Sequence, residues 1–160
     1  MKKQFELLGA TRQNVLRVLE ESSKEFLLKI PTGFSNNILW NIYHLLASQQ
    51  LLIYGLSQTP FRLEKEFIFK YKSGTIPSGE EDLNLIDFAK INLLTTVKQL
   101  SEDYQKSIFG DFKTIKTSYG LELQNVEDAI YFNNLHEAMH YGQIKTFQRI
   151  LNNTSHIQTQ

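Results

Sequence analysis

Four long segments with apolar residues at helical spacing, separated by prolines and glycines, are the feature that most constrains how this chain can fold. The first segment covers about residues 3–29, and its apolar residues lie largely three, four or seven positions apart, as on one face of a helix. The second follows the breaker "PTGF", where Ser35 or Asn36 can act as the N-cap, and Gly55 and Pro60 mark the region where it ends. Both segments predict helices.

The third and fourth segments predict two more long helices. The third begins with "SGEE", a capping-box pattern in which Ser78 is the cap and Glu81 reaches back to it, and it continues to about Lys106. The fourth begins with "NVED", with Asn125 as the cap and acidic residues in the first turn, where they interact favourably with the helix dipole. We expect this helix to end near Leu151.

Two stretches between these segments lack the helical period. Residues 107–123 place β-branched and aromatic residues around Tyr119 and Gly120, which predicts a short extended stretch or a hairpin. Residues 57–79 form a long connection, and its aromatic run "EFIFKYK" is expected to pack as a lid or along an edge at the end of the helices. The aromatic anchors expected in this connection are Phe61, Phe67, Phe69 and Tyr71.

Four amphipathic helices with a long crossover between the second and third predict an all-α, four-helix bundle with a short extended or hairpin segment before the last helix. The alternative is an α+β domain in which residues 107–123 belong to a small sheet. A length of 160 residues corresponds to one domain. We expect that domain to cover residues 1–152, followed by a polar tail at residues 153–160 that contains a solvated His156.

The composition excludes several classes of function. Seventeen basic and seventeen acidic residues give a formal net charge of zero, and the basic residues are scattered, so nucleic acid is not expected as a partner. The absence of cysteine excludes disulfides, thiolate ligands and a thiol nucleophile from the chain itself. No apolar run approaches the ~20 residues that span a bilayer, and the N-terminal region is too polar for a signal peptide. We expect a cytoplasmic protein with no membrane partner.

Three of the four histidines lie on helix faces that should point inward. His136 and His140, in "LHEAMHYGQI", are four residues apart and therefore share one face of the last helix. Asn133 lies one turn before them and Gln143 nearly one turn after, so a polar island interrupts a mostly apolar stripe. His44 lies near the middle of the second helix, in "NILWNIYHLLASQQ". Because the helices of a bundle converge on one interior, the three histidines could meet there.

The residues alone leave three interpretations of these histidines open: a metal site, a proton-transfer pair, or ordinary interior histidines, each satisfied by one donor and one acceptor. Three imidazoles suit Zn, Ni, Cu or Fe and leave positions open for water or substrate. The sequence identifies no catalytic acid or base, since Glu137, ~100° round the helix from His136, is expected to be a solvated or interhelical carboxylate. Gly142 is expected to allow a close helix approach, because a mid-helix glycine otherwise costs ~1 kcal/mol relative to alanine.

Together these features resemble the DinB/YfiT-like superfamily of metal-binding four-helix bundles. The segment "NNILWNIYHLLASQQLL" is similar to its W-x-x-x-H-L pattern on the second helix, and "LHEAMHYGQI" to its H-x-x-x-H-x-G-Q-I/L pattern on the last helix. The resemblance implies that a divalent metal ion is bound by His44, His136 and His140, with Zn or Ni favoured over Mn or Fe. Gln143 and Trp40 match positions near that site, and Trp40 is interpreted first as a packing residue.

The resemblance also implies classes of function. Members of the superfamily include metal-dependent transferases that use low-molecular-weight thiols such as bacillithiol or mycothiol, a maleylpyruvate isomerase, and proteins without a known activity. We therefore expect a metal-dependent enzyme that activates a thiol or water and acts on small electrophiles, resembling a thiol-dependent S-transferase or a related hydrolase or isomerase. The alternative is a non-catalytic, stress-associated binding protein with a structural metal or none.

The resemblance further implies a homodimer and a small-molecule substrate. Because the chain has no cysteine, any sulfur nucleophile must arrive with a cosubstrate. Asn133 and Gln143 are expected around the metal site, where they could hydrogen-bond the ligand imidazoles or a metal-bound water. The alternative for each is a polar residue at a seam between two helices, and for Asn133 this alternative is favoured.

Overall fold

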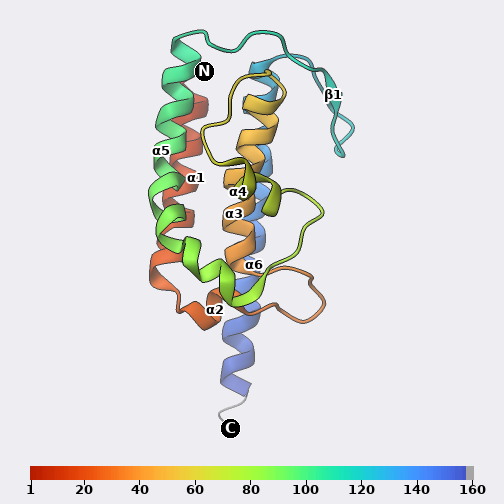
Figure 1. Cartoon of the computed structure of the whole chain (residues 1–160). Helices are drawn as coiled ribbons and strands as arrows, with labels where there is room; N and C mark the ends of the chain where they lie inside the picture. Colours follow the sequence, from red (N-terminus) through yellow and green to blue (C-terminus); the bar gives the residue numbers. More distant parts are fainter. Residues whose placement is uncertain (158–160) are drawn as a thin grey trace.

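The computed structural model describes the backbone of residues 1–157 and the side chains of residues 1–153, and it confirms the predicted all-α class. Ten short and long elements follow one another along the chain (Figure 1). In order they are α1 (Lys2–Glu21), α2 (Lys24–Leu28), α3 (Ile38–Gln49), the π-helix η1 (Gln50–Gly55), α4 (Lys65–Lys70), the 3-10 helix η2 (Gly79–Leu85), α5 (Ile86–Gln105), β1 (Ile115–Lys116), β2 (Glu122–Leu123) and α6 (Val126–Ile157).

The four long helices α1, α3, α5 and α6 run alongside one another (Figure 1). Helix α1 contacts α5 and α6, and α3 packs between the same two helices. Their facing sides bury a core rich in bulky residues, among them the fully buried Tyr43, Tyr54 and Phe147. Burying an aromatic side chain of this size contributes on the order of 2–3 kcal/mol. Within the described residues, no helix is both long enough and apolar enough to cross a membrane.

The prediction of one helix over about residues 3–29 is wrong, because two helices, α1 and α2, occupy this segment. Helix α1 ends at Glu21, and both Ser22 and Ser23 have extended backbone conformations. The hydroxyl of Ser23 then accepts a hydrogen bond from the amide of Phe26, 3.2 Å away, and caps α2. A serine side chain that bonds a nearby backbone amide competes with a continuous helix, which is why the break falls at this serine pair.

Helix α3 begins one or two residues later than predicted, with Asn37 rather than Ser35 or Asn36 as its cap. The Asn37 Oδ1 accepts from the amide of Trp40 at 2.8 Å, while its Nδ2 donates to the carbonyl of Leu28 at 3.0 Å. The same side chain therefore ends α2 and starts α3. After Gln49 the helix widens into η1, which ends at Gly55 as the sequence predicts.

The long connection after η1 contains helix α4, which the sequence analysis did not predict. Phe67 and Tyr71 are buried and Phe61 is partly buried, as expected of aromatic anchors. Phe69 is 48% exposed, so its predicted role as an anchor is wrong. It lies on the face of α4 opposite Phe67, which packs on Tyr43.

The capping box predicted for Ser78 and Glu81 is also wrong. The carboxylate that reaches back belongs to Asp82, whose Oδ2 accepts from the amide of Ser78 at 2.9 Å. Asp82 is fully buried, and its Oδ1 also accepts from the hydroxyl of Tyr71 at 2.6 Å. The chain is held in the 3-10 geometry of η2 here and becomes α-helical only at Ile86.

The predicted hairpin is confirmed, with Ile115 paired to Leu123 across its two short strands. Gly120 occupies the turn with a φ of 82°, a conformation that suits glycine. The Asn125 cap is confirmed as well, since its Oδ1 accepts from the amide of Asp128 at 2.8 Å. Because the two strands contain only two residues each, the all-α description holds over the α+β alternative.

The predicted end of the last helix at Leu151 is wrong, because α6 continues to Ile157. Residues 152–157 contain no glycine or proline that would stop it. Part of the predicted tail at residues 153–160 is therefore helical. Residues 158–160 and the predicted solvation of His156 lie outside the described backbone and side chains.

Candidate metal centre

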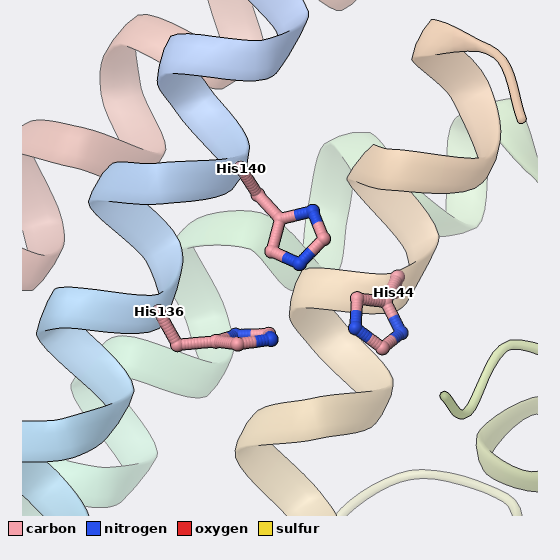
Figure 2. Close-up of side chains that lie close together, drawn as sticks. All are labelled: His44, His136 and His140. Atoms are coloured by element: carbon pink, nitrogen blue, oxygen red, sulfur yellow. The ribbon is translucent and has the colours of Figure 1, made fainter. Parts of the chain in front are cut away.

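Three histidines from two helices meet in the interior. His44 projects from α3, and His136 and His140 project from α6 toward the same space (Figure 2). One nitrogen from each ring can be chosen so that all three lie within 4.8 Å of one another. The ring centroids are 5.2 Å apart for His44 and His136, 4.7 Å for His44 and His140, and 4.5 Å for His136 and His140.

The surroundings of His44 make it the rigid member of the group. It is 4% exposed, and the indole of Trp40 stacks on its ring with centroids 4.7 Å apart and an interplanar angle of 10°. Trp40 itself is 5% exposed and donates through Nε1 to the hydroxyl of Thr75 at 3.1 Å. These contacts agree with the interpretation of Trp40 as a packing residue.

A backbone carbonyl fixes the tautomer of His44. Its Nδ1 lies 2.8 Å from the carbonyl oxygen of Tyr71. Because a carbonyl oxygen can only accept, Nδ1 carries the proton and donates. The lone pair of the neutral ring is then on Nε2, which faces the other two histidines and lies 3.1 Å from the hydroxyl of Ser48.

A side-chain amide fixes the tautomer of His140 by similar logic. The Nδ2 of Asn41 donates to the carbonyl of Asn37 at 2.7 Å and to the Oδ1 of Asn36 at 3.0 Å. This orientation turns the Oδ1 of Asn41 toward His140, whose Nδ1 is 2.7 Å away and must donate. Nε2 of His140 is thereby left with its lone pair, as it is in His44.

Burial keeps all three imidazoles neutral. Burial lowers the pKa of His44, whereas the hydrogen bond from its Nδ1 to the carbonyl of Tyr71 has the smaller, opposite effect. Burial, with smaller contributions from His44 and the cation of Arg12, lowers the pKa of His136 to about 4. Burial and the two neighbouring imidazoles lower the pKa of His140 to about 3. Metal ligands must be deprotonated, so the donor set fits a divalent cation at neutral pH.

Next to the histidines lies a buried ion pair that the sequence analysis did not predict. Arg12 of α1 and Glu137 of α6 are both fully buried, and their side chains form a two-point contact through Nε with Oε2 and through Nη2 with Oε1. Nη2 of Arg12 also donates to the carbonyl of Leu45 in α3 at 3.1 Å. Of the two roles expected for Glu137, a solvated or an interhelical carboxylate, the structure shows the second. Both of its oxygens accept hydrogen bonds from Arg12.

Asn133 and Gln143, the two residues expected around the metal ligands, form no hydrogen bond with the histidines among the described side chains. Nδ2 of Asn133 donates to Oε1 of Glu137 at 3.0 Å, and no hydrogen bond joins its side chain to a histidine among residues 1–153. Gln143 is half-buried on α6 and makes no side-chain hydrogen bond within the same described side chains. Their support of the imidazoles stays a prediction.

The structure also reveals supporting residues that the sequence analysis missed. Asn41 and Ser48 lie on the same face of α3 as His44, one turn before and one turn after it, so helical spacing could have identified them. Arg12 interrupts the buried face formed by Phe5, Leu8, Val15 and Leu19, which signals a buried cation in need of a partner. The carbonyl of Tyr71 comes from the connection after α4, and no sequence pattern marks a backbone acceptor.

The close helix approach expected at Gly142 does not occur among the described residues of the chain. A Cβ placed on Gly142 would meet no atom within 4 Å, so no helix of the same chain approaches it closely. The predicted close approach is wrong for the described residues. Gly142 instead lies on the exposed side of α6.

Comparison with known protein families identifies a match. The sequence profile described as the DinB superfamily matches residues 7–144. The matched region contains His44, His136 and His140 and extends from α1 into α6. No curated protein matches the chain.

Proposed function

The chain belongs to the DinB superfamily, and we propose that it binds one divalent cation through His44, His136 and His140 and uses it for catalysis on a small-molecule substrate. We further propose that α1, α3, α5 and α6 correspond to the four helices of the superfamily's bundle. Imidazole ligands favour Zn or Ni, with Mn or Fe as weaker alternatives.

The observation that carries this proposal is that hydrogen bonds within the chain already orient two of the three imidazoles for metal binding. The carbonyl of Tyr71 and the Oδ1 of Asn41 each accept a hydrogen bond from an Nδ1–H, which directs the Nε2 lone pairs of His44 and His140 into the shared space. Such partners on the far side of the ring are typical of metal-ligating histidines. A histidine that only packs in the core has no need of a second histidine beside the ring nitrogen that carries its lone pair.

The chemistry proposed for the site follows from its donor set. A divalent cation held by three neutral imidazoles supplies Lewis acidity, which lowers the pKa of a thiol or water bound at its open positions. The clustered group of donors among the described residues contains no carboxylate, because Glu137 is engaged by Arg12. His136 and His140 are half-buried, so this side of the site faces solvent more than His44 does.

We propose that the reaction is the transfer of a low-molecular-weight thiol to a small electrophile. The chain contains no cysteine, so its own residues can bind and orient a thiol but cannot provide one. Hydrolysis or isomerisation at the same site are the related alternatives. The chain's residues have a supporting part: Trp40 and Ser48 hold His44, and Asn41 holds His140.

A non-catalytic protein with a structural metal is the second candidate, and one observation favours it. His44 is 4% exposed and its ring lies between Trp40 and the carbonyl of Tyr71, as in a site built for rigidity. In this case the metal would stabilise the contact between α3 and α6 without turning over a substrate.

A thiol-transfer assay separates the two candidates. Protein reconstituted with Zn²⁺ or Ni²⁺ is incubated with bacillithiol, mycothiol or glutathione and a small alkyl halide, and halide release is followed. We expect a rate above background that needs metal, persists in His156→Ala and is lost in His136→Ala/His140→Ala. If wild-type protein holds metal but shows no metal-dependent turnover with any thiol, the thiol-transfer proposal fails, and the retained metal favours the structural candidate.

A further inference from the structure

The partly open side of the metal site continues along α6 as far as Phe132. Phe132, His136 and His140 follow one another at intervals of four residues, so they share one face of the helix, and all three are half-buried. Toward the N-terminal end of α6 this face closes, because Ala129 is fully buried. Phe132 is therefore the residue of α6 that bounds the open side of the site in this direction.

Aromatic contacts lead from the site to the tip of the hairpin. The ring centroid of Phe132 lies 6.4 Å from that of His136. The ring centroid of Tyr119 lies 6.3 Å from that of Phe132, at an interplanar angle of 70°, which is an edge-to-face arrangement of the kind that aromatic rings favour. Tyr119 is nevertheless 56% exposed, so a further apolar group can still pack on its ring.

The hairpin of β1 and β2 stands beside the helix bundle rather than inside it (Figure 1). Its turn is closed by hydrogen bonds from the amide of Gly120 to the carbonyl of Thr117 at 2.9 Å and from the amide of Thr117 to the carbonyl of Leu121 at 2.8 Å. Leu123, which is 3% exposed, anchors the hairpin to the core. Neither the turn nor this anchor requires an aromatic residue at the tip, so the packing of the hairpin does not account for Tyr119.

A hollow of about 280 Å³ lies between the hairpin and α6 and shares Phe132 with the metal site. Its apolar walls are Leu121, Leu123, Tyr131, Phe132 and Leu135. An apolar cavity of about 150 Å³ can hold a benzene ring, so this hollow is large enough for a substituted one.

The charges around the hollow determine what kind of group fits it. Its charged lining residues are Glu122 and Asp128, and none of the described residues that line it is basic. Both carboxylates accept hydrogen bonds from Gln124, Asp128 from the backbone amide at 2.9 Å and Glu122 from Nε2 at 3.1 Å. They would repel an anionic group placed beside them. The hollow is therefore suited to an uncharged apolar group.

We propose that Phe132, Tyr119 and the hollow beside them bind an uncharged aryl group of the electrophile that reacts at the metal site. This inference rests on the proposed function, because it concerns a substrate of the same site. Aromatic rings pack at centroid distances of about 4.5–7 Å, and an aryl group held on Phe132 lies close to His136. We therefore expect benzylic electrophiles to be preferred over small alkyl ones and over anionic ones.

Binding of an unreactive aryl compound to metal-free protein tests the subsite itself. Para-fluorobenzyl alcohol is titrated, and the fluorine NMR signal of the compound is followed. We expect saturable binding in the wild type, binding about 3–10-fold weaker in Tyr119→Ala, and wild-type affinity in Phe69→Ala. Phe69→Ala is the matched control, because Phe69 is an aromatic residue with 48% exposure that lies on α4 and does not line the hollow.

Two further measurements keep this test decisive. Phe132→Leu, with the helical circular dichroism retained, should also weaken binding, because it keeps an apolar side chain but removes the ring. Para-fluorobenzoate, which carries a negative charge, should bind about ten-fold more weakly than the alcohol. No saturable binding in the wild type, or equal affinities of the wild type and Tyr119→Ala, would overturn the proposal.

Loading with Co²⁺ tests where the bound aryl group lies. This ion replaces Zn²⁺ and is paramagnetic, so it broadens the signal of a fluorine atom bound close to it. We expect broadening in the wild type and none in His136→Ala/His140→Ala. Retained cobalt that leaves the signal of the bound compound sharp would contradict a subsite beside the metal. If no metal is retained, the proposed function fails, whereas the titration of metal-free protein still decides whether the subsite exists.

The rates of metal-loaded protein test the expected specificity. When para-fluorobenzyl chloride reacts with a low-molecular-weight thiol, an S–C bond forms, chloride leaves with the electron pair of the C–Cl bond, and the thiol proton passes to the buffer. We expect Tyr119→Ala to raise the KM for this substrate, relative to the KM for iodoethane, by about 3–10-fold. An unchanged ratio would contradict the subsite, while a protein that turns over neither substrate would contradict thiol transfer alone.

Discussion

The carbonyl of Tyr71 and the amide of Asn41 turn His44 and His140 from interior side chains into prepared ligands. Each oxygen accepts a hydrogen bond from the Nδ1–H of one ring, so the lone pair of that ring is on Nε2 and points into the shared space. The lone pair of His44 accepts from the hydroxyl of Ser48 there. His136 differs, because its Nδ1 is buried and has no partner among the described side chains. At the scale of single residues, the site therefore contains two oriented imidazoles and one that is held by its position on α6.

Removing the acceptor of His140 should weaken metal binding without removing a ligand. We expect Asn41→Ala to bind Zn²⁺ about 10–100-fold more weakly, since losing a hydrogen-bond partner of a metal ligand typically has this effect. Competition with a chromophoric chelator measures the affinity. Asn92→Ala is the control, because the Nδ2 of Asn92 donates to the carbonyl of Phe88 in its own helix. Equal affinities for the two variants would show that Asn41 does not orient His140.

Residue patterns predict part of this site and omit the rest for physical reasons. Helical periodicity is sufficient to bring His136 and His140 to one inward face and His44 to another. Hydrogen-bond partners are harder to predict because any backbone carbonyl can accept, and the one used here is contributed by Tyr71, 27 positions after His44. Spacing also suggested Asn133 near the imidazoles, but its amide bonds Glu137 instead.

At the scale of elements, the buried pair of Arg12 and Glu137 joins α1, α6 and α3 beside the histidines. Breaking such a pair from one side leaves an uncompensated buried charge, which costs about 3–5 kcal/mol, whereas replacing both partners by apolar residues is often nearly neutral. The pair is therefore expected to specify how the helices meet more than to stabilise the fold.

A double-mutant cycle tests this role by urea denaturation. We expect Glu137→Leu to lower the free energy of unfolding by about 3–5 kcal/mol and Arg12→Met/Glu137→Leu to recover most of that loss. Glu6→Ala, which breaks the exposed ion pair with Lys3, should change stability by less than about 1 kcal/mol. If the double variant is as unstable as Glu137→Leu, the buried charge is not the cause.

The boundaries of the elements show where periodicity stops being informative. Apolar spacing runs through Ser22 and Ser23 without a gap, yet the capping bond of Ser23 divides the segment into α1 and α2. In the same way, Asp82 rather than Glu81 receives the amide of Ser78, because the carboxylate also accepts from Tyr71 in the core. Local hydrogen bonds and distant packing decide these ends, and a sequence pattern records neither directly.

At the scale of the whole molecule, keeping three neutral histidines inside makes the metal-free protein sensitive to acid. An unfolded histidine has a pKa near 6.5, while burial lowers that of folded His136 to about 4 and of folded His140 to about 3. Below pH 6.5 the unfolded chain therefore binds protons that the folded chain does not. Their contribution to stability is complete above that pH and is lost as the pH falls toward 4 and then 3.

Urea denaturation of metal-free protein between neutral and acid pH measures this dependence. We expect the free energy of unfolding to fall with pH in the wild type and to fall less steeply in His136→Gln/His140→Gln, since glutamine does not titrate. Carboxylates are shared by the two proteins, so their contribution cancels in the difference. Parallel curves would mean that the buried histidines take up no protons on unfolding.

The overall class was the most predictable feature, because four amphipathic segments and the hairpin around Tyr119 and Gly120 dictate it locally. What the sequence left open was how the segments would pair and what would fill the space between α3 and α6. The central claim is that this space holds one metal ion bound by three histidines.

Elemental analysis of tag-free protein, loaded with Zn²⁺ or Ni²⁺ and then desalted, tests that claim most directly. We predict one ion per chain in the wild type and in His156→Ala, which removes only the fourth histidine. We predict almost none in His136→Ala/His140→Ala, because a single imidazole cannot retain the ion. Equal and negligible metal in the wild type and the double variant would contradict the account.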